Sequence, residues 1–220
     1  MIVTYNKYSA ARPFIKWVGG KGQLLTQLEE NFPQELYDEA FTYVEPFVGG
    51  GAMLFHMLQN FVNIKRVVIN DINRNLTDAY ANIKQEPEGL VYRLKHIEQQ
   101  YLPIEDYEEQ RTFYLEMRRS FNEDALSSLD KTALLIFLNR TCFNGLYREN
   151  AKGKFNVPFG RYVNPTICNE EVIYDDSQRD LAAFCRMLDR KDNVRWMLSN
   201  SDCSAKNPAD TFYYNYKIAC

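Results

Sequence analysis

The centre of this chain is the segment Thr42-Tyr43-Val44-Glu45-Pro46-Phe47-Val48-Gly49-Gly50-Gly51. Its first half is rich in aromatic and β-branched residues, which predicts a strand, and the residues that follow, 52–59, predict a helix. The glycines let the backbone approach a ligand closely, and the helix start behind them offers N–H donors. This is the pattern of a nucleotide site, although an ordinary tight turn explains the glycines alone equally well.

An acidic residue lies where such a site needs one. A short apolar strand at 67–69 leads to Asp71, which stands 20 residues after Gly51 (71 − 51 = 20). A carboxylate at this place accepts hydrogen bonds from the ribose hydroxyls of a bound nucleoside, so it favours a cofactor site over an ordinary turn. The glycine pattern is neither GxGxxG nor the phosphate-binding GxxxxGK, which disfavours a kinase or an NTPase. An adenosine cofactor without phosphates fits better, and S-adenosylmethionine is the obvious case.

The rest of the chain alternates strands with helices. This alternation predicts an α/β sheet with helical crossovers. The middle of the chain is mainly helical and then basic, which predicts an insert or subdomain. The further helices that we expect span residues 22–31, 74–85, 87–100, 107–121, 128–139 and 177–190, and a further strand spans 194–198.

Composition narrows the class of protein. With 220 residues, 45% hydrophobic and 25% charged, the chain has the make-up of one large globular domain, or of a domain with a small insert. Its five scattered cysteines form no CxxC, which argues against a disulfide framework and a zinc site and suits a reducing cytoplasm. The two histidines disfavour mechanisms that need several. No apolar stretch is long enough for a membrane span, and we expect no metal.

The N-terminal segment Phe14-Ile15-Lys16-Trp17-Val18-Gly19-Gly20-Lys21 is a second candidate element. Its tryptophan offers a flat face, its glycines allow close backbone approach, and Lys21 can pair with a carboxylate such as that of methionine. Taken in isolation, the segment fits a buried tryptophan with surface lysines better.

Residues 139–162 form a basic, aromatic segment. They hold five basic residues and one acid, a local balance of +4 in a chain whose net charge is −3. Arginines interleaved with Asn, Tyr and Phe can contact phosphates and base edges, and aromatic rings can stack on an extruded base. A solvated loop anchored by its aromatics is the alternative. Because the whole chain is acidic, any nucleic-acid binding must rest on this local patch.

Together and in this order, these elements resemble the Dam-like DNA adenine-N6 methyltransferases over most of the chain. The resemblance implies a Rossmann-like methyltransferase sheet with an inserted, mostly helical DNA-recognition subdomain. Residues 1–75 and 170–220 would form the catalytic α/β domain, and 76–169 the recognition subdomain. The matching motifs are Phe14–Lys21, Glu45-Pro46-Phe47-Val48-Gly49-Gly50-Gly51-Ala52, Asn70-Asp71-Ile72-Asn73, Phe143-Asn144-Gly145-Leu146-Tyr147-Arg148, Phe155-Asn156-Val157-Pro158-Phe159-Gly160 and Leu198-Ser199-Asn200-Ser201-Asp202.

The resemblance assigns roles to matching positions. S-adenosylmethionine would be the cofactor and double-stranded DNA the partner, with GATC as the default target because many members read it. The expected cofactor contacts are Trp17, Lys21, Phe47, Gly49, Gly51 and Asp71. The expected DNA contacts are Asn144, Arg148, Pro158, Arg161 and Tyr162.

One departure from the family concerns the chemistry itself. The family's catalytic motif, Asp-Pro-Pro-Tyr, does not occur, and only 12 residues (178 − 165 − 1 = 12) separate Pro165 from Gln178, where relatives carry several tens more. That motif's Asp and a backbone carbonyl accept the hydrogens of the adenine amino group, and its Tyr stacks on the flipped base. The catalytic residues therefore stay unassigned.

Three interpretations remain open. In the first, the protein is an active methyltransferase with further residues between about 169 and 176 that this sequence lacks. In the second, it is a truncated, catalytically inactive remnant that binds DNA. In the third, it is a methyltransferase that acts on RNA or on a small molecule, and this interpretation gains if neutral substitutions at Arg148 and Arg161 leave DNA binding unchanged.

Overall fold

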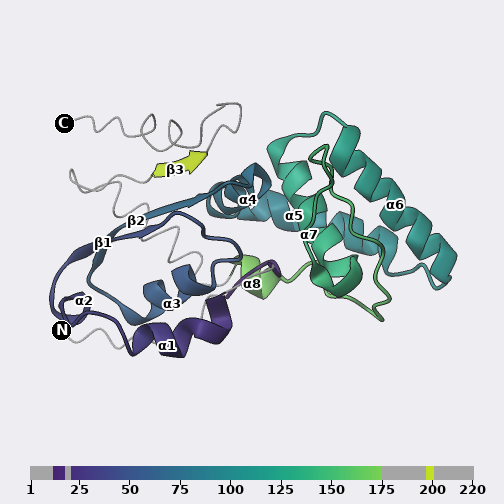
Figure 1. Cartoon of the computed structure of the whole chain (residues 1–220). Coiled ribbons are helices and arrows are strands. Elements are labelled where there is room, and N and C mark those ends of the chain that lie inside the picture. Colours follow the sequence, from purple (N-terminus) through teal and green to yellow (C-terminus); the bar gives the residue numbers. More distant parts are fainter. Residues whose placement is uncertain (1–11, 18–20, 175–196, 201–220) are drawn as a thin grey trace.

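A computed structural model describes residues 12–17 and 21–174, and the backbone of 197–200 (Figure 1). The protein is mixed α/β, mostly helical, with one small parallel sheet in the order β1-β2-β3. The strands are β1 (Phe41–Glu45), β2 (Ile64–Asp71) and β3 (Met197–Asn200). The coarse α/β prediction is therefore confirmed. The expected helix at 177–190 and residues 194–196 of the last expected strand lie outside the described residues.

The connection from β1 to β2 follows from their parallel pairing. Parallel neighbours need a crossover, and helix α3 (Ala52–Asn60) supplies it. β2 is longer than its apolar run predicts, because pairing with β1 extends it back to Ile64, opposite Phe41. Since the strands are parallel, their carboxyl ends meet at one edge of the sheet. The glycine turn after β1 and Asp71 at the end of β2 thus lie at the same edge.

The first expected helix forms only in part. A 3₁₀ turn, η1 (Lys21–Leu24), leads into the short helix α1 (Leu25–Glu29), and a further short helix, α2 (Glu35–Asp38), precedes β1. All five residues of α1 stay at least partly exposed. Such short helices depend on packing rather than on their own hydrogen bonds, which explains why apolar periodicity overestimated this one.

The four helices expected in the middle of the chain are present almost at their predicted bounds. They are α4 (Arg74–Gln85), α5 (Pro87–Tyr101), α6 (Tyr107–Glu123) and α7 (Ser128–Thr141). Three begin at a polar N-cap whose side chain accepts a backbone N–H, namely Asn73, Asp106 and Ser127. Local capping is the reason why sequence placed these helix starts well. After them come the turn η2 (Phe143–Gly145) and the short helix α8 (Glu170–Tyr174).

Helix α7 is the centre of the helical part. Ten of its 14 residues are buried, and α4, α5 and α6 all pack against it. A helix that is apolar on every side belongs inside a protein. Because α4 also packs against β2 and β3, it joins the helical part to the sheet (Figure 1). None of the helices in the described part of the chain combines the length and apolar character that crossing a bilayer requires.

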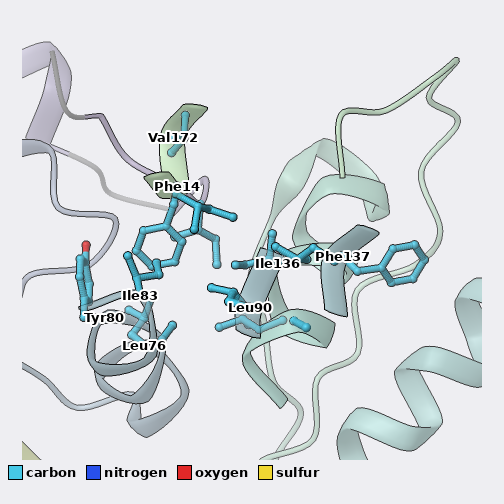
Figure 2. Close-up of a cluster of buried hydrophobic side chains, with 14 of the residues drawn as sticks. Phe14, Leu76, Tyr80, Ile83, Leu90, Ile136, Phe137 and Val172 are labelled. Carbon is cyan, nitrogen blue, oxygen red and sulfur yellow. The ribbon is translucent and has the colours of Figure 1, made fainter. Parts of the chain in front are cut away.

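The N-terminal segment enters this core through Phe14. Its side chain is 2% exposed, and its ring meets that of Tyr80 edge-on at 5.1 Å. Figure 2 shows Phe14 among side chains of α4, α7 and α8, including Ile136 and Val172. Burial of this aromatic ring fixes the start of the described chain against α4 and α7.

The carboxamide of Asn139, near the end of α7, fastens the same segment by hydrogen bonds. Its Oδ1 accepts from the backbone N–H of Lys16 at 2.9 Å, and its Nδ2 donates to the Lys16 carbonyl at 2.9 Å and to the Gly145 carbonyl at 2.8 Å. The neighbouring Arg140 donates to the Phe14 carbonyl at 2.8 Å. The side-chain amide thus pairs with Lys16 as a neighbouring strand would.

Substituting Asn139 tests this fastening. Asn139→Ala leaves backbone groups of Lys16 and Gly145 without their partner, and each buried unsatisfied group costs about 1–3 kcal/mol. We expect the free energy of unfolding, measured with urea, to fall by about 3 kcal/mol. The control Asn60→Ala removes an exposed amide that bonds only within α3, and it should cost under about 0.5 kcal/mol. Equal losses in the two variants would contradict the role given to Asn139.

Candidate functional site

The glycine turn after β1 has a backbone that requires glycine at two positions. Gly49 has a φ of 52° and Gly51 a φ of 82°, both in the left-handed region. A Cβ added at Gly51 would lie 2.4 Å from the hydroxyl of Tyr80. Gly51 is also the N-cap of α3 and has no side chain to cover the helix start. The turn and the start of α3 therefore present bare backbone at the edge of the sheet.

Asp71 fastens this turn to the end of β2. Its Oδ2 accepts the backbone N–H of Gly49 at 2.9 Å, and its Oδ1 accepts that of Asn73 at 2.9 Å. The hydroxyl of Tyr80 donates to the Gly49 carbonyl at 3.1 Å from the other side. A carboxylate has about four lone-pair sites, so these two bonds leave capacity for a ligand. The structure thus brings the predicted acid and the predicted turn together.

Trp17 lies against the same turn. A Cβ added at Gly49 would lie 3.1 Å from Cδ1 of Trp17, and one added at Gly50 would lie 3.2 Å from its Cβ. The indole is half-buried. The N-terminal element and the glycine turn, which sequence treated as separate signals, therefore form one surface. The side chain of Lys21 lies outside the described part, and its role stays a prediction.

Two large apolar side chains are exposed where the strands end. Phe47 follows β1 and is 64% exposed, and Ile72 follows β2 and is 65% exposed. Apolar side chains at the carboxyl ends of parallel strands are typical contacts for a flat ligand ring. Sequence reasoning proposed Phe47 but missed Ile72. Its signal was present, since an isoleucine directly after the strand-terminal Asp71 has left the buried part of the sheet.

Buried carboxylates make this edge of the sheet acidic. Glu45 is 3% exposed and accepts the hydroxyl of Tyr43 at 2.8 Å, and Asp71 is 6% exposed. Burial, reinforced by Glu45 and Asp71, raises the pKa of Tyr80 well above its ordinary value. An acidic edge suits a ligand with positive charge. Within the described residues, no group of three or more His, Cys, Asp and Glu side chains could hold a metal ion.

The basic segment folds into an irregular antiparallel ribbon, which we define as residues 142–149 paired with 155–159. Antiparallel bridges join Cys142 to Phe159 and Glu149 to Phe155. The intervening turn includes Gly153 with a φ of 70°. Across the ribbon, the guanidinium of Arg148 donates from Nε to Oδ1 of Asn156 at 2.8 Å. The segment is therefore ordered by local pairing rather than by regular strands.

Helix α6 holds the second half of this ribbon. Asn122 pairs with the backbone of Phe155 in both directions, donating to its carbonyl at 2.9 Å and accepting its N–H at 2.8 Å. The carbonyl of Val157 accepts from Tyr114 at 2.8 Å and from Arg118 at 3.0 Å. These bonds explain how an irregular ribbon stays in place, and they leave the next residue, Pro158, exposed.

Three of the predicted DNA contacts lie exposed on the ribbon. They are Asn144, with a left-handed φ of 56°, Arg148 and Pro158. The backbone N–H of Phe143 donates to the Pro158 carbonyl at 2.9 Å, which places Asn144 and Pro158 at the same end.

The other two follow the ribbon. The guanidinium of Arg161 is exposed and lies 4.7 Å from the ring centroid of Tyr107, at the start of α6. Tyr162 is half-buried and covers Gly160, where an added Cβ would lie 2.6 Å from its ring. Arg161 is therefore the freer of the two to meet a partner.

Two basic residues make contacts that the sequence did not predict. Arg140, counted in the basic segment, is half-buried and bonded to Phe14, and burial, helped by the nearby Arg12, lowers its pKa. The Arg140 guanidinium therefore stabilises the packing of the N-terminal segment and is not available as a DNA contact. Lys16 is exposed, and its Cδ lies 2.6 Å from the position of a Cβ added at Gly145. Lys16 thus joins the start of the ribbon, a contact that only the tertiary structure reveals.

Comparison with known proteins adds an independent finding. The family model described as D12 class N6 adenine-specific DNA methyltransferase matches residues 17–175. The chain is also similar to the type II methyltransferase M.MjaIII of Methanocaldococcus jannaschii, with 45% identity over 163 residues, or 73% of this chain and 56% of the relative.

Two further relatives agree with this match. The type II methyltransferase M1.LlaDCHI of Lactococcus lactis is 38% identical over 170 residues, covering 76% of this chain and 54% of the relative. The DNA adenine methylase of Escherichia coli is 31% identical over 173 residues, covering 79% of this chain and 56% of the relative. The chain spans about half the length of the curated relatives it matches.

The glycine turn yields a stability prediction. Gly51→Ala forces a side chain into a left-handed backbone and against Tyr80, so we expect the free energy of unfolding to fall by about 1–3 kcal/mol. Gly22→Ala is the matched control, since a Cβ there meets nothing within 4 Å. It should leave the melting temperature unchanged or raise it slightly. A Gly51→Ala protein as stable as the control would show that the turn tolerates a side chain.

Proposed function

Because the chain belongs to the D12 class of N6 adenine-specific DNA methyltransferases, we propose that the protein transfers a methyl group from S-adenosylmethionine to N6 of adenine in double-stranded DNA. The observation that carries this proposal is the family match over residues 17–175, which includes both the glycine turn and the ribbon. We further infer a Rossmann-like catalytic domain from 1–75 and 170–220, with 76–169 as the recognition subdomain. The reducing cytoplasm suits its free thiols at Cys142 and Cys168.

The edge of the sheet is the proposed cofactor site. Asp71 would accept the ribose hydroxyls, since its carboxylate keeps lone pairs beyond its two backbone bonds. Phe47 offers an exposed ring to the adenine, and Trp17 packs against Gly49 and Gly50 of the turn. Gly49 and Gly51 would let the backbone approach the ligand, and Lys21 would pair with the methionine carboxylate. The acidic surroundings suit the positive sulfonium and ammonium groups of this cofactor.

The ribbon is the proposed DNA-binding surface. Arg148 would read a base edge and Pro158 would contact a base, while Asn144, Arg161 and Tyr162 would complete the contacts. Lys16, whose side chain packs against Gly145, adds a positive charge at the start of the ribbon. The target GATC follows from the resemblance to the Dam-like enzymes and rests on nothing else.

A second candidate function is a catalytically inactive DNA-binding remnant. The observation that favours it is the missing Asp-Pro-Pro-Tyr motif, since none of the eight prolines is followed by another. Without that motif's Asp and Tyr, cofactor and DNA can still bind, but the adenine amino group is not activated.

Methyl transfer and intact mass together decide between the two. Tritiated S-adenosylmethionine is incubated with the purified protein and a GATC duplex, or a duplex with one base pair changed. Transfer to the GATC duplex supports the enzyme and this target. No transfer to the GATC duplex counts against the target, and no transfer to any DNA excludes the activity. An intact mass above 25.8 kDa would mean that the protein carries further residues. A protein of 25.8 kDa that binds both ligands without transfer is the remnant.

The cofactor site predicts a specific loss of affinity. Phe47→Ala removes an exposed ring, so the fold should keep its melting temperature while the dissociation constant for S-adenosylmethionine rises about tenfold, about 1.4 kcal/mol. Calorimetry measures the affinity. Val62→Ala is the control, because Val62 is 85% exposed and lies in the loop before β2. Unchanged affinity in Phe47→Ala would remove Phe47 from the site.

Alanine substitutions at two positions of the ribbon and its turn should weaken DNA binding in two different ways. Arg148→Ala should cost about 1–3 kcal/mol on the GATC duplex and less on a duplex with one altered base pair, because a base contact is lost. Lys152→Ala, at the exposed turn of the ribbon, should weaken both duplexes equally and lower the salt slope by about 1. Fluorescence anisotropy at several salt concentrations measures both. A uniform loss with Arg148→Ala would make it a phosphate contact instead.

A further inference from the structure

The proposed cofactor site and the proposed DNA ribbon meet at one aromatic pair. The indole of Trp17 stacks on the ring of Tyr147, with centroids 4.6 Å apart and planes 25° from parallel. Each ring of the pair belongs to a different proposed site. Trp17 lies against the glycine turn, and Tyr147 is the ribbon residue directly before Arg148. A movement of the ribbon at Tyr147 would therefore also displace Trp17, which packs against the glycine turn.

The hydroxyl of Tyr147 makes a second link to the same edge of the sheet. It accepts a hydrogen bond from Nδ2 of Asn75 at 3.0 Å and donates to Glu149. Burial raises the pKa of Tyr147, so the hydroxyl keeps its proton at neutral pH and can serve both partners. Asn75 lies in the first turn of α4, next to the strand end.

From Asn75 the bonds lead directly to Asp71. The backbone N–H of Asn75 donates to the side chain of Asn73 at 3.0 Å, and the N–H of Asn73 donates to Asp71 at 2.9 Å. Asp71 in turn holds Gly49. Tyr147 thus reaches the glycine turn twice, through its ring and Trp17 and through its hydroxyl and the start of α4.

From this arrangement we propose that Tyr147 is a positioning residue that couples cofactor binding to DNA binding, so that each ligand raises the affinity for the other. This inference rests on the proposed function of both sites. A cofactor that orders Trp17 and Asp71 fixes both routes from Tyr147 to the glycine turn. The ribbon is then already ordered when it binds DNA, so less conformational entropy is lost. Linkage makes the effect reciprocal.

The coupling is measured as a ratio of dissociation constants. Calorimetry gives the affinity of the full chain for S-adenosylhomocysteine, which cannot transfer a methyl group, with and without a saturating GATC duplex. In the wild-type protein we expect the duplex to tighten binding about fivefold or more, within the usual range of coupling. Tyr147→Phe keeps the stack but loses the hydroxyl, and its ratio should fall to about half or less. Tyr147→Leu loses both links, and its ratio should approach one.

Controls separate coupling from a simple loss of fold. Tyr92→Phe changes a tyrosine that is 73% exposed on α5 and should keep the wild-type ratio. Tyr147→Phe should also keep the wild-type melting temperature, and its affinity for S-adenosylhomocysteine without DNA should stay within about twofold of wild type. A residue with a merely structural role would not change the coupling ratio while these two quantities stay the same. Trp17 fluorescence, in a Trp196→Phe background that leaves one tryptophan, reports whether the stack responds to the duplex.

The outcomes are distinguishable. Binding of neither ligand by the wild-type protein refutes the proposed function, and the inference falls with it. Binding of both ligands with a ratio of one, or with the same ratio in wild type, Tyr147→Phe and Tyr147→Leu, overturns the coupling and leaves the proposed function standing; Tyr147 would then only anchor the ribbon.

Discussion

The hydrogen bonds of the Asn139 carboxamide connect the parts of this protein. One side chain at the end of α7 pairs with both backbone groups of Lys16 and also holds Gly145. It therefore sets the N-terminal segment, the central helix and the start of the ribbon relative to one another. Trp17 directly follows Lys16, and the ribbon includes Gly145, so both are held next to Asn139. Together with the Trp17–Tyr147 stack, it sets the ribbon against the N-terminal segment.

Side-chain amides hold irregular backbone at several places in the described part of the chain. Asn122 pairs with Phe155 as Asn139 pairs with Lys16, and Asn73 caps α4 beside Asp71. A carboxamide presents one acceptor and two donors in nearly the geometry of a peptide group. It can therefore satisfy backbone groups that no strand or helix satisfies. In this way the ribbon is held without regular sheet pairing.

Charge is divided between the two candidate surfaces. The sheet edge carries buried Glu45 and Asp71, while the ribbon carries exposed Arg148 and Lys152, in a chain whose net charge is only −3. A positively charged cofactor and a polyanionic duplex need opposite surroundings. The two candidate surfaces adjoin at the Trp17–Tyr147 stack, so the proposed cofactor and the proposed duplex would lie close together.

Local patterns in the sequence determined the elements of this fold. The strand, glycine turn and helix around Gly49–Gly51 and the four helices from 74 to 141, three of them capped, were predictable, because periodicity, glycine and N-caps act within a few residues. The place of Asp71 beside the turn also followed, since parallel strands end at one edge. Only the tertiary structure decided that Arg140 serves the fold, that Lys16 joins the ribbon, and that Trp17 stacks on Tyr147. These contacts join segments more than a hundred residues apart, and they depend on how α7 and α4 pack, which no local pattern contains.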